Sequence, residues 1–432
     1  MSTKKSFAQR TARVRRPERT QVEFFTESID QLVPRDHRCR IVWRFVEGLD
    51  LNPFYKTIRV SDSQAGRTAI SPEVLIALWL MATLDGISSA RELERRCQTD
   101  LIYRWICGGV SVNHHTIGDF RVDHGDKLNE ILTSSIASLI HQGFVHLEQL
   151  GQDGMRVRAA AGSSSFRRKP TLEQLHREAQ KHLQELDDQR KNDRDDDDSS
   201  APRSRSEAAR DRAAREREER IARALAESEK LRDKKTKDED KEKVRTSTTD
   251  PDARRMKMGD GGTRPALNVQ FATDGDARVI VGVEVTNEGT DGGQLEPMLD
   301  QIEDRYSRRP NRVLVDSAYA TKASVKASES GGTAVISTVP RSEQLRSHGK
   351  DPHQRQKGDS DEYEAFRKRM ALPENQELYK KRPSIAEFPN ADCRNRGLTQ
   401  FRVRGLIKTK AVTLWHALAF NLLRMVEMGA IA

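Results

Sequence analysis

Apolar positions recur with helical spacing through the first third of the chain, from Phe24 to Gln142. The segment from Ser71 to Leu84 opens with Ser-Pro, which favours a helix start, and is then apolar almost throughout. It predicts a buried helix, with shorter helices and an amphipathic run after it. Several short helices around the break at Gly108-Gly109 suit a helix-turn-helix-like DNA-binding module, and they suit any other small helical bundle equally well.

After residue 143 the helical spacing of apolar residues ends, and apolar residues recur at every second position. A strand is expected from Phe144, with alternation continuing to Ala159, and a hairpin is expected over 267–286, because Asp274-Gly275-Asp276 is a turn signal. A helix over 294–306 and strands over 313–315 and 335–339 follow. Antiparallel strands followed by alternating helix and strand predict a mixed α/β sheet.

A charge-dense segment interrupts this pattern between residues 170 and 245. Two helical stretches, 171–190 and 207–235, flank the run Asp195–Asp198, and a narrow stripe of leucines predicts that they form a hairpin projecting from the sheet. Consecutive acids alternate in direction, so we interpret the acidic run as a solvated loop and not as a metal site.

The chain of 432 residues is long enough for two or three domains. We expect a basic flexible arm over 1–22, a helical domain over 23–142 and a catalytic domain over 143–432, the last interrupted by the insertion at 170–245. Four scattered cysteines form no CxxC pair, which argues against a disulfide framework or a zinc site.

Charge narrows the class of partner. Lys and Arg total 75 against 66 Asp and Glu, a net charge of +9, which favours a polyanion such as nucleic acid or a membrane surface. With no apolar run of about 18 residues and no signal peptide, the membrane reading is weak and a soluble cytoplasmic protein is expected. Residues 1–20 hold seven Lys or Arg and one Glu, so the arm either follows phosphates or only aids solubility.

Three acids are candidates for metal chemistry. Asp153 and Asp316 each follow an apolar segment, and an acid at the end of a buried strand is exposed on a rigid backbone. Strand-end aspartates also cap turns, so each signal alone is weak. Glu387 and Arg394 are seven residues apart, which on a helix would place both on one face, although Pro389 makes a regular helix unfavourable.

The tract Tyr379-x2-Arg382-x4-Glu387-x6-Arg394 resembles the signature of bacterial insertion-sequence transposases of the DDE class. The segments Asp153-Gly154-Met155-Arg156 and Val315-Asp316-Ser317-Ala318-Tyr319 look like those that carry the two family aspartates, and the segment from His115 to Arg121 resembles part of the family's DNA-binding domain. This chain has Arg394 where relatives often have Lys, and Asn390 where they often have His.

The resemblance implies an RNase H-like core preceded by an all-α domain. It implies that Asp153, Asp316 and Glu387 are catalytic and hold two Mg²⁺ or Mn²⁺ ions. It further implies DNA contacts by several side chains, namely Tyr379, Arg382, Arg394, His115 and Arg121. The implied activity is cleavage and strand transfer of double-stranded DNA, at terminal inverted repeats and a target, by a homodimer in the bacterial cytoplasm, associated with the nucleoid when bound. A nuclease without strand transfer and an inactive end-binding repressor are the alternatives.

Overall fold

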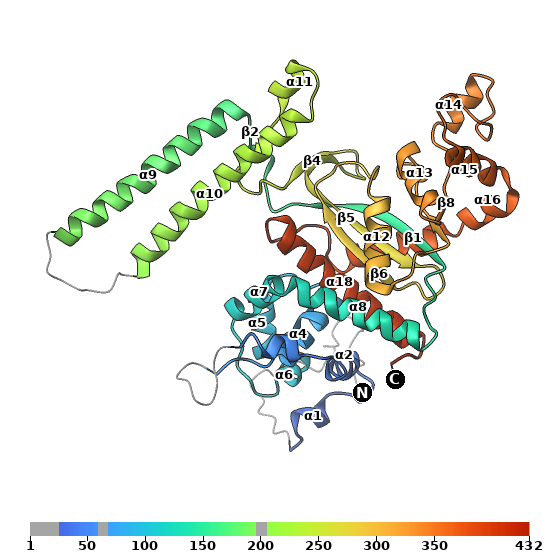
Figure 1. Cartoon of the computed structure of the whole chain (residues 1–432). Helices are drawn as coiled ribbons and strands as arrows, with labels where there is room; N and C mark the ends of the chain where they lie inside the picture. Colours follow the sequence, from blue (N-terminus) through green and yellow to red (C-terminus); the bar gives the residue numbers. More distant parts are fainter. Residues whose placement is uncertain (1–25, 59–67, 196–204, 432) are drawn as a thin grey trace, which may run out of the picture.

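The computed structural model describes residues 26–58, 68–195 and 205–431 (Figure 1). The basic arm at 1–22 therefore lies outside the described residues. The same holds for Asp196–Asp198, so the interpretation of the acidic run as a solvated loop is not tested.

The N-terminal region is helical, as its periodicity predicted. Helix α4 begins where the sequence indicated: the Ser71 side chain accepts a hydrogen bond from the Glu73 backbone, and every residue from Val74 to Leu84 is buried. The helices of this region are α1 (Ile29–Leu32), α2 (Arg38–Glu47), α3 (Asn52–Tyr55), α4 (Pro72–Leu84), α5 (Ala90–Thr99), α6 (Leu101–Cys107), α7 (His114–Asp123) and α8 (Gly125–His141).

A six-stranded mixed sheet follows, with strand order β4-β5-β1-β7-β8 and with β6 also paired to β5. Strand β5 pairs antiparallel with β4, β6 and β1, whereas β1 pairs with β7, and β7 with β8, in parallel. This order and these directions confirm the predicted mixed sheet of an RNase H-like core. The strands are β1 (Gln149–Arg158), β4 (Arg254–Lys257), β5 (Thr263–Asp274), β6 (Ile280–Thr286), β7 (Arg312–Leu314) and β8 (Ala334–Ile336).

Helices join and flank these strands. The predicted hairpin turn is present, because the Asp274 carboxylate accepts hydrogen bonds from the backbone of Asp276 and Ala277. The remaining elements are η2 (Ser163–Ser165), β2 (Phe166–Arg167), α11 (Asp238–Lys243), β3 (Thr246–Ser247), α12 (Leu295–Tyr306), α13 (Lys322–Ser330), α14 (Ser342–Ser347), α15 (Asp361–Ala371), α16 (Pro373–Tyr379), η3 (Pro383–Glu387), α17 (Phe388–Asn395) and α18 (Leu406–Glu427).

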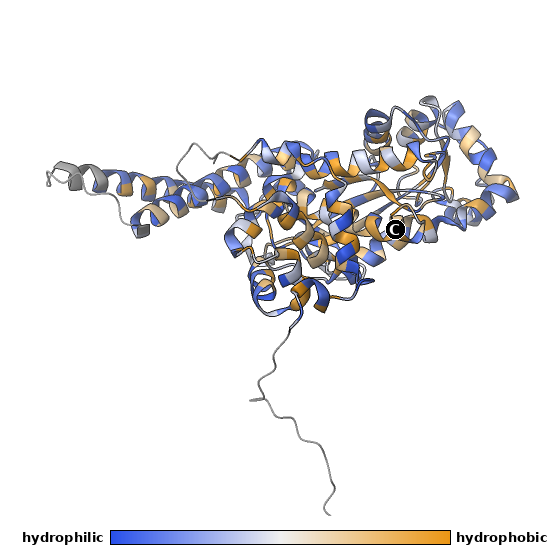
Figure 2. Cartoon of the chain, turned by 90° about the horizontal axis from the view of Figure 1, so that it is seen from below, coloured by the Kyte–Doolittle hydropathy of each residue, from blue (hydrophilic) through white to orange (hydrophobic). Residues whose placement is uncertain are grey.

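Helices α9 (Lys169–Asp195) and α10 (Arg205–Asp233) form the expected hairpin, which projects away from the sheet in Figure 1. Leu172 and Ala179 are buried along it, and the imidazole of His176 lies 2.8 Å from the Glu218 carboxylate between the two helices. Figure 2 shows that the hairpin is largely hydrophilic, whereas the strands of the sheet are hydrophobic. Its stability therefore rests on a narrow apolar seam.

Helix α18 joins the N-terminal helices to the sheet. It packs on β6 on one side and on α4, α7 and α8 on the other. The Trp415 indole donates a hydrogen bond to the carbonyl of Arg121 (3.0 Å), and the Asn421 amide pairs with both backbone groups of Ile280. The two regions consequently share one hydrophobic core. Among the described residues, no helix has both the length and the apolar character needed to cross a membrane.

The buried His416 of α18 predicts a pH effect on stability. Burial, reinforced by the cations of Arg121 and Arg396, lowers its pKa to about 3. The unfolded value is about 6.5, so between these values protons bind only the unfolded chain, and stability falls as the pH falls through this window. For His416→Leu, which cannot titrate, we expect urea unfolding to show about 2 kcal/mol less loss than wild type between about pH 7 and about pH 5.

Carboxylates elsewhere titrate equally in both proteins, so the difference between the two pH profiles isolates His416. Parallel stability profiles for the two proteins would show that His416 takes up its proton equally well in the folded and in the unfolded chain.

A second prediction concerns Gly151 of β1, against which η3 packs. An added Cβ would lie 2.7 Å from Cγ2 of Ile385 and 3.1 Å from Cβ of Ala386. We therefore expect Gly151→Ala to lower the free energy of unfolding by about 1–3 kcal/mol, as overpacking does in a close-packed core. The control is Gly162→Ala, where the nearest atom lies 3.6 Å away. Equal unfolding midpoints in urea for the two variants would contradict this close packing.

Candidate active site

Asp153 lies in the interior of β1, which corrects the expectation that it ends a strand. Strand β1 pairs with β5 from Leu150 to Arg158, but with β7 only as far as Gly151. Beyond the end of β7, strand β1 therefore continues with β5 as its partner. Asp153 lies two residues beyond that point, at the end of the parallel part of the sheet.

Asp316 occupies the matching position on the adjacent strand. Gly151 of β1 is opposite Leu314, the last residue of β7, and Asp153 and Asp316 each follow two residues later. Parallel strands present their carboxyl ends at the same edge of a sheet, so both carboxylates emerge there. The Asp316 side chain is partly buried and accepts hydrogen bonds from the hydroxyl and the backbone N–H of Ser317.

Glu387 is brought to the same edge by a short π-helical turn. The backbone N–H of Phe388 donates to the carbonyl of Pro383, a five-residue step, and the next residue, Pro389, has no N–H to continue a regular ladder. This turn presses Ile385 and Ala386 onto Gly151 of β1. Glu387, at the end of η3, therefore lies beside the strand that carries Asp153.

Arg382 connects two of the three acids. Its guanidinium donates to Asp153 Oδ1 at 3.1 Å and to Glu387 Oε1 at 2.7 Å, and only 11% of the side chain is exposed. Burial alone would lower the pKa of Arg382. The charges of Asp153, Glu387 and Asp316, with Tyr379 contributing, outweigh that effect and raise it. All three acids therefore act electrostatically on one cation.

Asn390 also holds Asp153, a contact that the sequence did not predict. Its side-chain amide donates to Asp153 Oδ2 at 2.9 Å, and the residue is 3% exposed. Burial raises the pKa of Asp153 to about 6, against the opposing effects of Arg382 and Asn390 and with smaller additions from Glu387 and Asp291. The departure from the family's usual His at position 390 was the only signal in the sequence.

A fourth carboxylate, Asp291, lies buried next to Gly154. Its Oδ1 accepts from the amides of Asn268 (2.8 Å) and Gln270 (2.9 Å), and its Oδ2 accepts from Arg156 (3.0 Å). A Cβ at Gly154 would lie 2.3 Å from Oδ1, so this position requires glycine. The amides occupy the polar positions of the alternation in β5, and alternation alone does not show that both are buried. Together these contacts fix the part of the strand that directly follows Asp153.

The other predicted DNA contacts lie in different surroundings. Tyr379 is half-buried at the end of α16, near Arg382, and Arg394 is exposed on α17. His115 is exposed on α7, its ring 4.2 Å from that of His114.

Arg121, the remaining predicted DNA contact, is buried at 7% exposure. Its guanidinium lies 4.5 Å from the centre of the Trp79 ring and donates to the carbonyl of Ser88. Its guanidinium is therefore engaged inside the core and is not presented to DNA.

The donor set suits a hard divalent cation, since Asp153, Asp316 and Glu387 all offer carboxylate oxygens. As the side chains lie, no group of three or more His, Cys, Asp or Glu residues in the described part of the chain is gathered closely enough to bind a metal ion. Arg382 supplies positive charge between two of the acids instead. A metal ion that binds here would have to replace the Arg382 guanidinium as the partner of Asp153 and Glu387.

Comparison with protein families gives two matches. A family described as "Transposase domain (DUF772)" matches residues 27–123, and one described as "Transposase DDE domain" matches residues 238–422. No curated protein and no solved structure matched the chain. The second match includes Asp316 and Glu387 but not Asp153, which joins the site through its geometry.

Both matches agree with the signature around Glu387 and with the RNase H-like sheet. The chain belongs to the insertion-sequence transposases of the DDE class, which are enzymes that act on DNA.

Proposed function

We propose that this transposase binds the terminal inverted repeats of its insertion sequence and catalyses metal-dependent cleavage and strand transfer at their ends. One observation carries the proposal. Asp153 and Asp316 lie at matching positions on adjacent parallel strands, and Arg382 pairs with both Asp153 and Glu387, so three acids from distant segments meet at one edge of the sheet. Burying and gathering like charges costs stability, and this is characteristic of functional sites.

The same three carboxylates would hold two Mg²⁺ or Mn²⁺ ions. When bound, the ions would activate water or a DNA 3′-hydroxyl for attack and stabilise the leaving oxygen. Three acids do not balance the charge of two divalent cations, so a phosphate of the DNA is expected to complete the site.

Arg382 has a second role in this proposal. Its planar guanidinium matches a phosphate as well as it matches a carboxylate, through paired N–H donors. With cations bound at Asp153 and Glu387, the guanidinium would be free to pair with the scissile phosphate and to hold it in place for attack. Asn390 keeps Asp153 oriented while this exchange takes place. Tyr379 and Arg394, on either side of η3, are proposed to contact the flanking DNA.

We further propose that different segments of the chain have different roles. Residues 23–142, with His115 exposed on α7, would recognise the repeat, and residues 143–432 would carry out the chemistry. The segment 170–245 is an insertion in the catalytic part, and the basic arm at 1–22 would follow phosphates. Two copies would act together on one DNA in the bacterial cytoplasm.

Asp316→Asn tests the chemistry directly. The purified protein with Mg²⁺ should nick a duplex that carries the terminal repeat flanking its own gene. The substitution should lower the nicking rate by roughly a thousandfold, as loss of one charge-stabilising group does, while DNA affinity stays unchanged or rises. Asp304→Asn, an exposed acid on α12, is the matched control and should nick normally. Full cleavage by Asp316→Asn would refute the assignment of this residue, and a joined target product would separate a transposase from a simple nuclease.

Arg382→Gln tests the exchange between guanidinium and metal. Without its cation the acidic site should bind Mg²⁺ several-fold more tightly in calorimetry of the protein alone, because carboxylates in close proximity then lack a counter-charge. The maximal nicking rate should nevertheless fall by about 10–100-fold, because the phosphate is no longer held.

Arg394→Gln is the matched control for this experiment, since it removes an exposed arginine from the same segment. It should leave the affinity for Mg²⁺ unchanged. If Arg382→Gln also leaves that affinity unchanged, Arg382 does not compete with the metal.

A further inference from the structure

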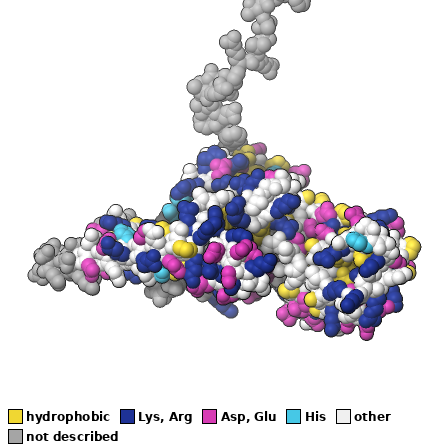
Figure 3. All heavy atoms as spheres, turned by 90° about the horizontal axis from the view of Figure 1, so that it is seen from above, with side chains coloured by type: hydrophobic (Ala, Val, Ile, Leu, Met, Phe, Trp, Pro, Cys, Tyr) yellow, Lys and Arg dark blue, Asp and Glu magenta, His cyan; other side chains and the backbone are white. Residues whose placement is uncertain are grey.

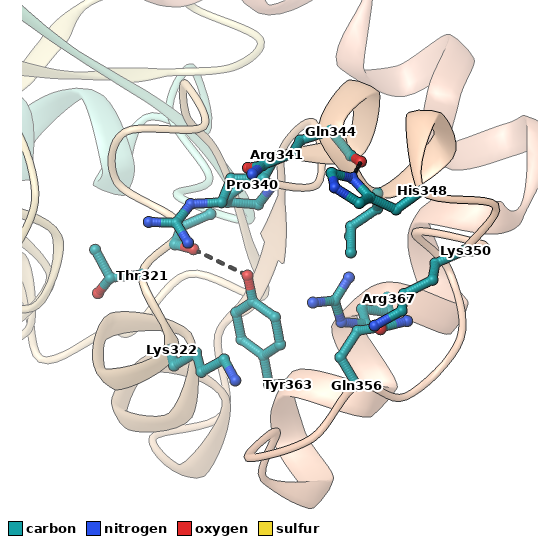
Figure 4. Close-up of a pocket in the computed structure, with 12 residues that line it drawn as sticks. Thr321, Lys322, Pro340, Arg341, Gln344, His348, Lys350, Gln356, Tyr363 and Arg367 are labelled. Atoms are coloured by element: carbon teal, nitrogen blue, oxygen red, sulfur yellow. Dashed lines mark hydrogen bonds between the residues drawn. The ribbon is translucent and has the colours of Figure 1, made fainter.

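A cavity of about 720 Å³ opens beside the segment that follows Asp316 (Figure 4). The turn after β7, the segment around α14 and helix α15 form its walls. None of the described residues that line it is acidic, whereas several are basic or aromatic, namely Lys322, Arg341, His348, Lys350, Tyr363 and Arg367. Figure 3 shows Lys and Arg side chains, with histidine among them, on the same lobe of the molecule.

The positive charge of this cavity is only partly balanced. Lys322 and Arg367 share one buried carboxylate, Asp359, at 2.8 and 2.7 Å. In the described part of the chain, neither Arg341 nor Lys350 forms an ion pair with an acid. Arg341 and Lys350 are both exposed, so their charges are available to an anion that enters the cavity from solvent. The cavity is therefore built for a negatively charged ligand.

Arg341 is held in a costly conformation. Its φ of 59° lies in the left-handed region, which a residue with a Cβ seldom adopts, at a cost of roughly 1–2 kcal/mol. In Figure 4 its side chain reaches across the cavity toward Thr321 and Tyr363, while Arg367 and Lys350 lie on the other side. The strained backbone thus aims a guanidinium with no ion-pair partner in the described residues into the cavity.

The tyrosine of the cavity offers no surface for stacking. The Tyr363 ring is 3% exposed, and Arg367 and Lys322 lie 5.0 and 5.9 Å from its centre. A base therefore cannot stack on this tyrosine, and the other ring in the lining is the small imidazole of His348. Recognition by charge alone points to the phosphate backbone.

The cavity is also close to the candidate active site. A tight turn leads from Asp316 to Thr321 in its wall, with hydrogen bonds from Tyr319 N–H to the Asp316 carbonyl and from Thr321 N–H to the Tyr319 carbonyl. Five residues span at most about 18 Å. That is about five nucleotides of a strand at a rise of about 3.4 Å each.

We propose that this cavity binds a backbone phosphate of the DNA strand, within about five nucleotides of the scissile bond. This rests on the proposed function, since it assumes that the strand is cut at Asp316. Arg341 and Lys350 supply the main contacts, and the site holds the strand in register for cleavage.

The test uses the full chain and a fluorescent duplex that carries the terminal repeat flanking its own gene. The double variant Arg341→Asn with Lys350→Gln removes both unpaired cations, and asparagine tolerates the left-handed backbone. The control Arg346→Gln with Lys326→Gln removes two exposed charges from α14 and α13, outside the cavity lining. In a salt titration of affinity, the cavity variant should lower the slope of log affinity against log salt by roughly two, and the control by much less.

Neutral methylphosphonate linkages then locate the phosphate. One linkage within about five nucleotides of the cut should weaken binding of wild type and of the control but not of the cavity variant, because the lost contact is already absent there. Equal salt slopes for the two variants, or no such linkage, would overturn the proposal even if wild type cleaves the duplex. If wild type fails to cleave but the salt slopes differ and a linkage near the outer end of the repeat behaves in this way, the cavity stands and the proposed chemistry fails.

Discussion

The arrangement of the site depends on how unequally β1 is paired. The strand has a partner along its whole length on the β5 side, but on the β7 side for only three residues. Where β7 stops, a backbone fixed by hydrogen bonds on one side is left open on the other. Next to this point η3 packs over β1 and β5, and the absence of a side chain at Gly151 permits that contact. Both aspartates and the glutamate are placed by this single feature.

Electrostatics sets the second constraint. Carboxylates this close together repel one another, and burial makes the charged state of Asp153 still less favourable. The guanidinium that Arg382 shares between two acids, the amide of Asn390 and the hydrogen bonds around the nearby Asp291 offset this repulsion. A strand held in this way presents its acids with little freedom to reorganise, which favours the binding of metal ions and phosphates.

Much of the fold could be predicted from the sequence, because apolar periods of 3.6 and two reflect local geometry. The start of α4, the hairpin near Asp274 and the paired helices α9 and α10 all follow from local signals. Asp153 was misplaced because alternation shows where a strand continues but not where one neighbour ends. The enclosure of Arg121 could not be foreseen either, since it depends on Trp79 and Ser88, which are remote in sequence. Nor does spacing reveal that Arg382 pairs with the acids.

Helix α18 has a mechanical consequence. Helix α18 lies in one core that the N-terminal helices and the sheet share. The two regions are therefore packed together as one rigid body and move together. If the N-terminal helices recognise a DNA sequence and the sheet carries the cutting site, the protein fixes the distance between the two. The distance in base pairs from recognised sequence to broken bond would then be a property of the protein's packing. Changing that distance would require repacking α18 and could not be achieved by lengthening a linker.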